Sequence, residues 1–169
     1  TVKVAMLGVG QRGLQHLHAL RQLPDAQVVA LCDPYPDNLS EEKIRRYAPG
    51  FTASGIGLYT SFADLLAAGG FDALYVSIPP GRHDGEVVRA AAAGIHIFAE
   101  KPVSLFLDEA REQDEAIRRA GVISTVGFNQ RHCVWHTAMR DFLADKRLVM
   151  MTVVGNAALE GHSVKHTHT

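Results

Sequence analysis

Short runs of apolar and largely β-branched residues recur along the chain as far as residue 127 and predict buried strands. Each run is continuously apolar and is bounded by Gly, Asp or Pro, a pattern typical of strands that are covered on both faces. The predicted strands lie at residues 2–7, 27–32, 73–78, 95–99 and 122–127.

Longer stretches with helical periodicity separate these runs. One of them begins near Ser40, where Glu41 and Glu42 suit the helix dipole, and two others end at Gly94 and Gly121, a usual position for a C-cap. The predicted helices cover residues 11–22, 38–48, 61–68, 84–93 and 107–120. This alternation of strand and helix predicts an α/β fold, a doubly wound parallel sheet with right-handed crossovers and helices on both faces.

The pattern changes near residue 130. Residues 132–145 predict a bridging helix, and residues 148–159 predict a long strand that no helix follows. Such a strand is expected to belong to a different sheet. We therefore predict one domain over residues 1–128 and the beginning of a second, incomplete α+β domain over residues 129–169.

The stretch "VKVAMLGVGQRGLQHLHAL" carries three glycines in G-x-G-x-x-G spacing between a predicted strand and a predicted helix. Gly8 permits the tight turn, Gly10 lets the backbone approach a pyrophosphate, and Gly13 lets the helix pack closely. Gln11 and Arg12 lie in the first turn of that helix, whose free N–H groups and dipole favour an anion. The stretch therefore predicts a dinucleotide-binding loop.

Asp33 ends the next strand, twenty positions after Gly13, as this type of loop requires. Its carboxylate would accept hydrogen bonds from the adenosine ribose and repel a 2′-phosphate, and "DPYP" brings no Arg or Lys nearby, so NAD is favoured over NADP. Two alternatives remain open, namely a turn that merely needs glycines and a methyltransferase with a similar first turn. A Walker-type phosphate loop is excluded because no Gly-Lys-Ser/Thr follows.

Two further segments follow strands and should meet the same edge of the sheet, "PPGRH" at residues 79–83 and "EKP" at residues 100–102. Ending a buried strand in charges is costly unless the charges have partners or reach solvent. At a cofactor site, Lys101 could place its ammonium near a substrate hydroxyl, and partial burial would lower its pKa toward the range of proton exchange. The alternative is a surface turn with a solvated Glu and Lys.

The segments "VAMLGVGQRG", "CDP", "SIPPGRHDGEVVRAAAAGIHIFAEKPVS" and "GFNQRH" occur in this order, and together they resemble the Gfo/Idh/MocA family from residue 2 to about 132. The resemblance implies a Rossmann nucleotide-binding domain in an NAD(P)-dependent oxidoreductase that acts on sugars, inositols or related polyols. In the family a lysine matching Lys101 contacts cofactor and substrate and assists proton transfer. The resemblance assigns further cofactor contacts to Glu100, Pro79, His83, Asn129 and Arg131. Ile78 departs from the Thr that many members carry before the proline.

The resemblance also implies a longer protein, whose second domain supplies a catalytic histidine, often with an Asp four residues before it. His168 is the best match, although Val164 occupies the position expected for the Asp. Two other interpretations stay open: an irregular chain end over residues 162–169, and a metal site formed by His162, His166 and His168. Without its substrate domain, such a chain would bind NAD with little or no turnover.

The composition narrows the possible partners. Seventeen basic and eighteen acidic residues give a formal net charge of −1 with no block of like charge, which argues against nucleic acid and a membrane surface. Two cysteines and the lack of a signal peptide favour a soluble, cytoplasmic protein. By resemblance, the full-length protein is expected to form a homo-oligomer. A non-catalytic NAD-binding sensor and an NAD-dependent glycosidase are the alternative functions.

Overall fold

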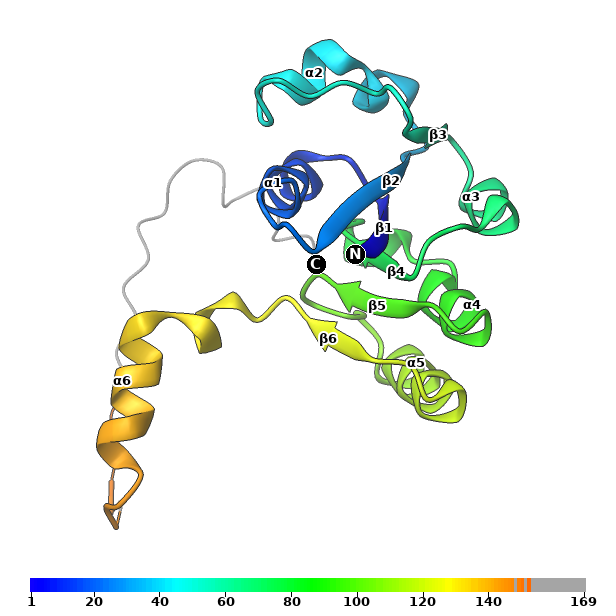
Figure 1. Ribbon diagram of the computed structural model, residues 1–169. Coiled ribbons are helices and arrows are strands. Elements are labelled where there is room, and N and C mark those ends of the chain that lie inside the picture. Colours follow the sequence, from blue (N-terminus) through cyan, green and yellow to red (C-terminus); the bar gives the residue numbers. More distant parts are fainter. Residues whose placement is uncertain (148, 151, 153–169) are drawn as a thin grey trace. The chain divides into compact units, whose positions relative to one another are not determined.

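The computed structural model in Figure 1 describes residues 1–147, 149–150 and 152 of the chain. The chain divides into two units, Thr1–Phe128 and Asn129–Thr169. The first unit contains every strand found among the described residues.

A six-stranded sheet forms the centre of the first unit, and all of its strand pairs are parallel. Its strand order is β3-β2-β1-β4-β5-β6. This is the order of two mononucleotide-binding halves joined beside the first strand, so the predicted doubly wound Rossmann sheet is confirmed. The strands are β1 (Val2–Leu7), β2 (Ala26–Cys32), β3 (Gly57–Tyr59), β4 (Ala73–Val76), β5 (His96–Ala99) and β6 (Ser124–Val126).

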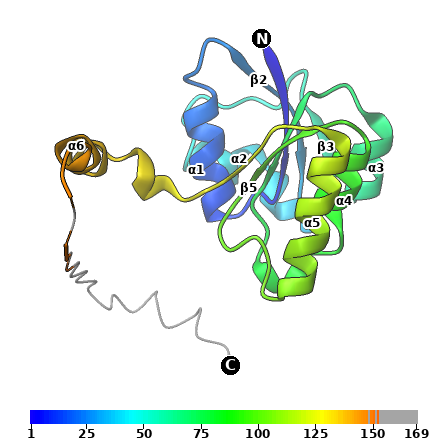
Figure 2. The same ribbon diagram turned by 90° about the horizontal axis from the view of Figure 1, so that it is seen from below.

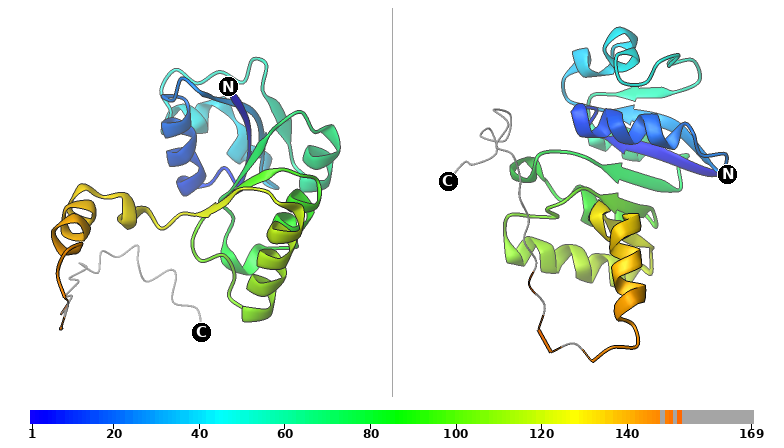
Figure 3. Two further views of the ribbon diagram at one scale, coloured as in Figure 1. Left: turned by 60° about the horizontal axis from the view of Figure 1, so that its bottom comes forward. Right: turned by 90° about the vertical axis from the view of Figure 1, so that its left-hand side faces the viewer.

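Helices cover both faces of this sheet, as Figures 1 and 2 show. α1 and α2 lie on one face, and α3, α4 and α5 lie on the other, which Figure 3 shows from two further directions. The helices are α1 (Gln11–Leu20), α2 (Glu41–Arg45), α3 (Phe62–Ala68), α4 (Glu86–Ala92) and α5 (Leu107–Ala120).

The core has two layers because successive side chains of a strand point to opposite faces. In β1, Val4 and Met6 pack with α1 and α2, whereas Ala5 and Leu7 pack with α3 and α4. Both pairs are buried, since Leu7 is the most exposed of the four at 5%. In β1 the continuous apolar run therefore corresponds to a strand covered on both faces, as predicted. The run over 122–127, also predicted to be buried, is different: Ser124 and Thr125 of the edge strand β6 are exposed.

Apart from shifts of one or two residues at element ends, the observed elements differ from the predicted ones in two places. β3 has only three residues, too few to produce a recognisable apolar run, and the sequence pattern does not predict it. The helix expected over residues 38–48 is a 3₁₀ turn over Pro36–Leu39 followed by α2. The break falls at Ser40, whose extended backbone ends the turn and whose Oγ accepts the Lys43 amide as the N-cap of α2.

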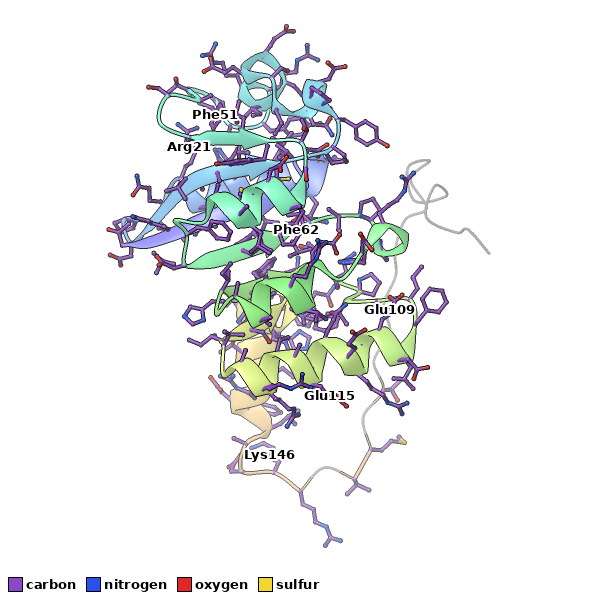
Figure 4. All side chains as sticks on the ribbon, turned by 90° about the vertical axis from the view of Figure 1, so that its right-hand side faces the viewer. Arg21, Phe51, Phe62, Glu109, Glu115 and Lys146 are labelled. Carbon is purple, nitrogen blue, oxygen red and sulfur yellow. The ribbon has the colours of Figure 1, made fainter. Side chains whose placement is uncertain are left out.

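Arg21, which directly follows α1, joins that helix to the loop after α2. Its guanidinium lies 5.7 Å from the centre of the Phe51 ring, and both residues are labelled in Figure 4. The same guanidinium donates hydrogen bonds to the backbone carbonyls of Ala48, Pro49 and Gly50. These contacts hold the loop after α2 on the α1 face of the sheet.

In the second unit, a 3₁₀ turn over Asn129–His132 precedes α6 (Val134–Leu143). This helix lies within the bridging helix predicted over residues 132–145. Most of the strand predicted over 148–159 lies outside the described residues. Among the described helices, none has the length and apolar character needed to cross a membrane.

Candidate dinucleotide-binding site

The segments predicted to bind a cofactor lie at one edge of the sheet, because they follow the carboxyl ends of parallel strands. The glycine loop follows β1, Asp33 follows β2, and Glu100 follows β5. The segment over residues 77–83 follows β4. The fold therefore brings together four segments that are far apart in the sequence.

The three glycines of the loop have different surroundings. Gly8 has φ +91°, and a Cβ there would lie 2.5 Å from the carbonyl oxygen of Ser77. A Cβ on Gly13 would lie 2.0 Å from the carbonyl oxygen of Gly8. A Cβ on Gly10 would have nothing within 4 Å. Gly8 and Gly13 are thus required by the fold, whereas the space beside Gly10 is open to a ligand.

The N-terminus of α1 is suited to an anion. Gly10 is the N-cap and supplies no side-chain hydrogen bond, and the first turn contains no acidic residue. Free backbone N–H groups and the positive end of the helix dipole remain at this end. Arg12 lies in the first turn, and its guanidinium donates a hydrogen bond to Gln15 Oε1 at 2.7 Å. The helix therefore offers donors that a diphosphate could occupy.

Asp33 is 4% exposed and has three hydrogen bonds within the protein. Its Oδ2 accepts the Val9 amide at 2.8 Å, and its Oδ1 accepts the Tyr35 amide at 3.0 Å and Asn38 Nδ2 at 2.8 Å. An ionised carboxylate has about four acceptor positions. One position on Oδ2 is therefore left for a ribose hydroxyl.

A lysine approaches this carboxylate through one intermediate residue. Lys43 Nζ donates to Asn38 Oδ1, and the amide of Asn38 donates to Asp33. The residues adjacent to Asp33 in the sequence, "DPYP", contain no Lys or Arg and therefore predict no cation nearby. α2 folds back over the end of β2 and brings in Lys43 from ten positions further along the chain.

The segment after β4 holds two polar groups without a hydrogen-bond partner in the described part of the chain. They are Ser77 Oγ, next to the glycine loop, and His83 Nδ1. The side chain of His83 is 7% exposed, and Nδ1 lies 3.6 Å from Glu86 Oε2. Pro79, in contrast, is exposed. The position of His83 is thus fixed mainly by burial beside Glu86.

Glu100 uses both carboxylate oxygens within the protein. Oε1 lies 2.7 Å from His16 Nε2, and Oε2 accepts the backbone amide of Lys101 at 3.1 Å. Lys101 is exposed, and no hydrogen bond or ion pair of its ammonium is found among the described residues. The Lys101–Pro102 peptide bond is cis. The charges after β5 therefore have different positions: Glu100 points back to α1, and Lys101 is open to solvent.

Sequence reasoning missed three residues of this site, His16, Asn38 and Lys43. His16 falls within the helix predicted over residues 11–22, and the helical pattern assigns it no role in the site. One signal was available, because Arg12 and His16 are four residues apart and so lie on one face of α1. Nothing in the sequence pairs that face with Glu100, which is 84 residues away.

The remaining candidates lie outside the first unit. Asn129 and Arg131 belong to the 3₁₀ turn of the second unit, so their contact with the cofactor stays a prediction. His168 and the possible metal ligands His162 and His166 lie outside the described residues. Among residues 1–147, 149–150 and 152, no group of three His, Cys, Asp or Glu side chains could hold a metal ion.

The parallel sheet, the open glycine loop and the acidic end of β2 define a dinucleotide-binding Rossmann domain. The chain belongs to the Gfo/Idh/MocA oxidoreductases, since the family described as "Oxidoreductase family, NAD-binding Rossmann fold" matches residues 2–128. The resemblance seen in the sequence and the prediction of NAD are therefore confirmed.

Two curated relatives and one solved structure illustrate the similarity. The 1,5-anhydro-D-fructose reductase of Ensifer adhaerens is 37% identical over 110 residues, which are 64% of this chain and 32% of that protein. The scyllo-inositol 2-dehydrogenase (NAD(+)) of Bacillus subtilis is 31% identical over 134 residues, or 77% and 36% of the two chains. The solved structure is an oxidoreductase from Agrobacterium radiobacter in complex with NAD+, L-tartaric acid and magnesium. It matches with a TM-score of 0.74 and 26% identity, and the match covers 85% of this chain and 40% of the Agrobacterium chain. The chain thus spans about a third of the length of these curated relatives.

Proposed function

We propose that the protein is an NAD-dependent oxidoreductase that acts on a hydroxyl-bearing carbon of a sugar, an inositol or a related polyol. The observation that carries the proposal is the meeting of the glycine loop, Asp33 and Lys101 at one edge of the sheet. The relatives named above, a reductase of an anhydro sugar and an inositol dehydrogenase, support the substrate class.

The residues of this edge fit a dinucleotide. The open space beside Gly10 and the uncapped end of α1 would take the diphosphate. The free acceptor position of Asp33 would take an adenosine ribose hydroxyl. Asp33 would also oppose a 2′-phosphate, because Lys43 reaches its carboxylate only through Asn38. These contacts support NAD as the preferred cofactor over NADP.

Lys101 is our candidate for the proton-handling residue. When bound, NAD supplies the hydride acceptor of the reaction. The ammonium of Lys101 is free to donate a hydrogen bond to a substrate hydroxyl and to exchange its proton. His168 remains the candidate for a second proton-transfer group, supported by the resemblance alone.

Hydride transfer is the test of this proposal. A panel of polyols and sugars with NAD, followed at the absorbance band of NADH, should reveal turnover by the protein with its natural termini. Lys101→Ala should abolish turnover and leave the affinity for NAD within about threefold of the original, because the diphosphate and ribose contacts remain. Lys3→Ala is the matched control, since Lys3 lies in β1 toward the opposite edge of the sheet and should be dispensable. Full turnover by Lys101→Ala would refute the assigned role.

A cytoplasmic location and a homo-oligomeric full-length protein complete the proposal. The family resemblance supports the oligomeric state, and the two widely spaced cysteines favour a reducing compartment. Sedimentation of the purified protein would test the oligomeric state, and a single species with the mass of one chain would contradict it.

A further inference from the structure

His16 connects two parts of the site that are distant in the sequence. It lies on α1, one turn beyond Gly13, and its Nε2 is 2.7 Å from Oε1 of Glu100, directly after β5. The two side chains are largely shielded from solvent, with exposed fractions of 22% for His16 and 13% for Glu100. A hydrogen bond of this length is electrostatically stronger between shielded groups than at an open surface, because the local dielectric is lower.

Two aromatic rings hold the imidazole in place. The ring of Phe98 lies edge-on to it at 5.0 Å and the ring of Tyr75 at 5.7 Å, measured between ring centres. Tyr75 and Phe98 stack on each other at 4.4 Å with an angle of 13° between their planes. The orientation of His16 is therefore set by β4 and β5 as well as by its own helix.

Glu100, which is held by His16, also contacts the backbone of the next residue, Lys101. Its second oxygen, Oε2, accepts the backbone N–H of Lys101. A Cβ on Gly127, which follows β6, would lie 2.9 Å from Oε1 of Glu100. The carboxylate thus fits closely against the end of β6 and has little room to turn.

Arg12 is a weaker partner of the same carboxylate. Its Nε lies 4.0 Å from Oε1, and its side chain is 53% exposed and bonded to Gln15. Exposed ion pairs of this kind contribute little free energy to holding two side chains together. His16 is therefore the group that determines where the carboxylate lies.

We propose that His16 is a positioning residue for Lys101 and acts through Glu100. The helix that would receive the diphosphate is linked by two hydrogen bonds to the backbone of the lysine that would meet the substrate. A displacement of about 1 Å in such a group can lower a rate about 100-fold. This inference rests on the proposed function, since a fixed lysine matters most for a reaction at its ammonium.

Steady-state kinetics of the protein with its natural termini test the proposal. His16→Leu should lower kcat about 10- to 100-fold, while KM for NAD changes much less, because the diphosphate and ribose contacts stay. His16→Gln keeps a side-chain N–H donor and should restore kcat to within about fivefold of the original. His18→Leu is the matched control, because His18 is an exposed residue of the same helix that pairs with Gln22.

A second measurement needs no turnover. Amide hydrogen exchange of Lys101 should become about tenfold faster in His16→Leu, because its acceptor loses the group that holds it. The Val9 amide, bonded to Asp33, is the internal reference and should not change. Unchanged exchange of Lys101, or an unchanged kcat in an enzyme that does turn over, would overturn the proposal. Absence of turnover in the original protein together with faster exchange would refute the proposed function and leave the positioning role supported.

Discussion

The amide N–H of Val9 donates a hydrogen bond of 2.8 Å to Oδ2 of Asp33. The end of β2 thereby holds the glycine loop that follows β1. The carboxylate that shapes the loop is also the one that would accept a ribose hydroxyl in the proposed site. Asp33 is buried, so these contacts cannot be replaced readily by water.

Replacement of Asp33 by Asn removes the negative charge and nearly preserves the shape of the side chain. The amide is almost the same size and does not repel a 2′-phosphate, but its NH2 group must face a donor, either the Val9 amide or those of Tyr35 and Asn38. We expect NAD to bind about tenfold more weakly, which is the value of one charge-assisted hydrogen bond. The preference for NAD over NADP should fall, which fluorescence titration with NADH and NADPH would measure. An unchanged preference would mean that Asp33 does not face the ribose.

Gly10 and Gly13 provide a matched pair of substitutions. Gly13→Ala places a Cβ 2.0 Å from the Gly8 carbonyl oxygen and should destabilise the fold by about 1–3 kcal/mol. Gly10→Ala meets nothing within 4 Å at an ordinary φ of −74° and should leave the unfolding free energy within about 0.5 kcal/mol. It should nevertheless weaken NAD binding, because the new methyl group fills the space for the diphosphate. Chemical denaturation and calorimetric titration separate the two effects, and normal NAD binding by Gly10→Ala would contradict the proposed diphosphate position.

Glu86 should make stability depend on pH. Burial by itself would raise the pKa of Glu86, but the nearby His83 imidazole and the backbone N–H groups of Asp84 and Glu86 outweigh burial and lower the pKa below its ordinary value of 4.5. A lowered pKa stabilises the folded state above the ordinary value, and this contribution is lost as the pH falls through the folded-state pKa. Glu86→Gln should therefore be less stable than the original at neutral pH, with a difference that shrinks in acid.

Urea denaturation over a series of pH values measures this difference. Glu112→Gln is the control, because Glu112 is exposed on α5 and should show no such trend. A difference between the Glu86→Gln variant and the original protein that stays constant into acid would contradict the prediction.

The two cysteines should differ in reactivity. Cys32 is 1% exposed, and burial, with a smaller effect of Asp33, raises the pKa of its thiol to about 11. Cys133 is half-buried. Since the thiolate is the reactive form, iodoacetamide at neutral pH should modify Cys133 first and Cys32 only after unfolding. Mass spectrometry of the modified peptides gives the order in which the two cysteines react. Early modification of Cys32 would contradict the prediction and show that β2 opens easily.

Local patterns determined most of the fold and part of the site. Apolar runs bounded by Gly, Asp or Pro predicted five of the six strands. α5 begins at Leu107 and ends at Ala120 as expected, because Gly121 caps it with φ +66°. The glycine loop and Asp33 were recognisable because their chemistry depends on residues close together in the chain or at a fixed spacing. The three-residue β3 carried no such pattern; it is a strand because it pairs with β2.

Only the tertiary structure decided which side chains meet at the site. His16 acquires its partner Glu100 across 84 residues, and Lys43 approaches Asp33 because α2 folds back over β2. The physical reason is that these hydrogen bonds form only after the sheet has placed its strand ends side by side. Sequence periodicity specifies which residues are buried and where strands end, whereas the pairing of polar groups at those ends depends on how the layers pack.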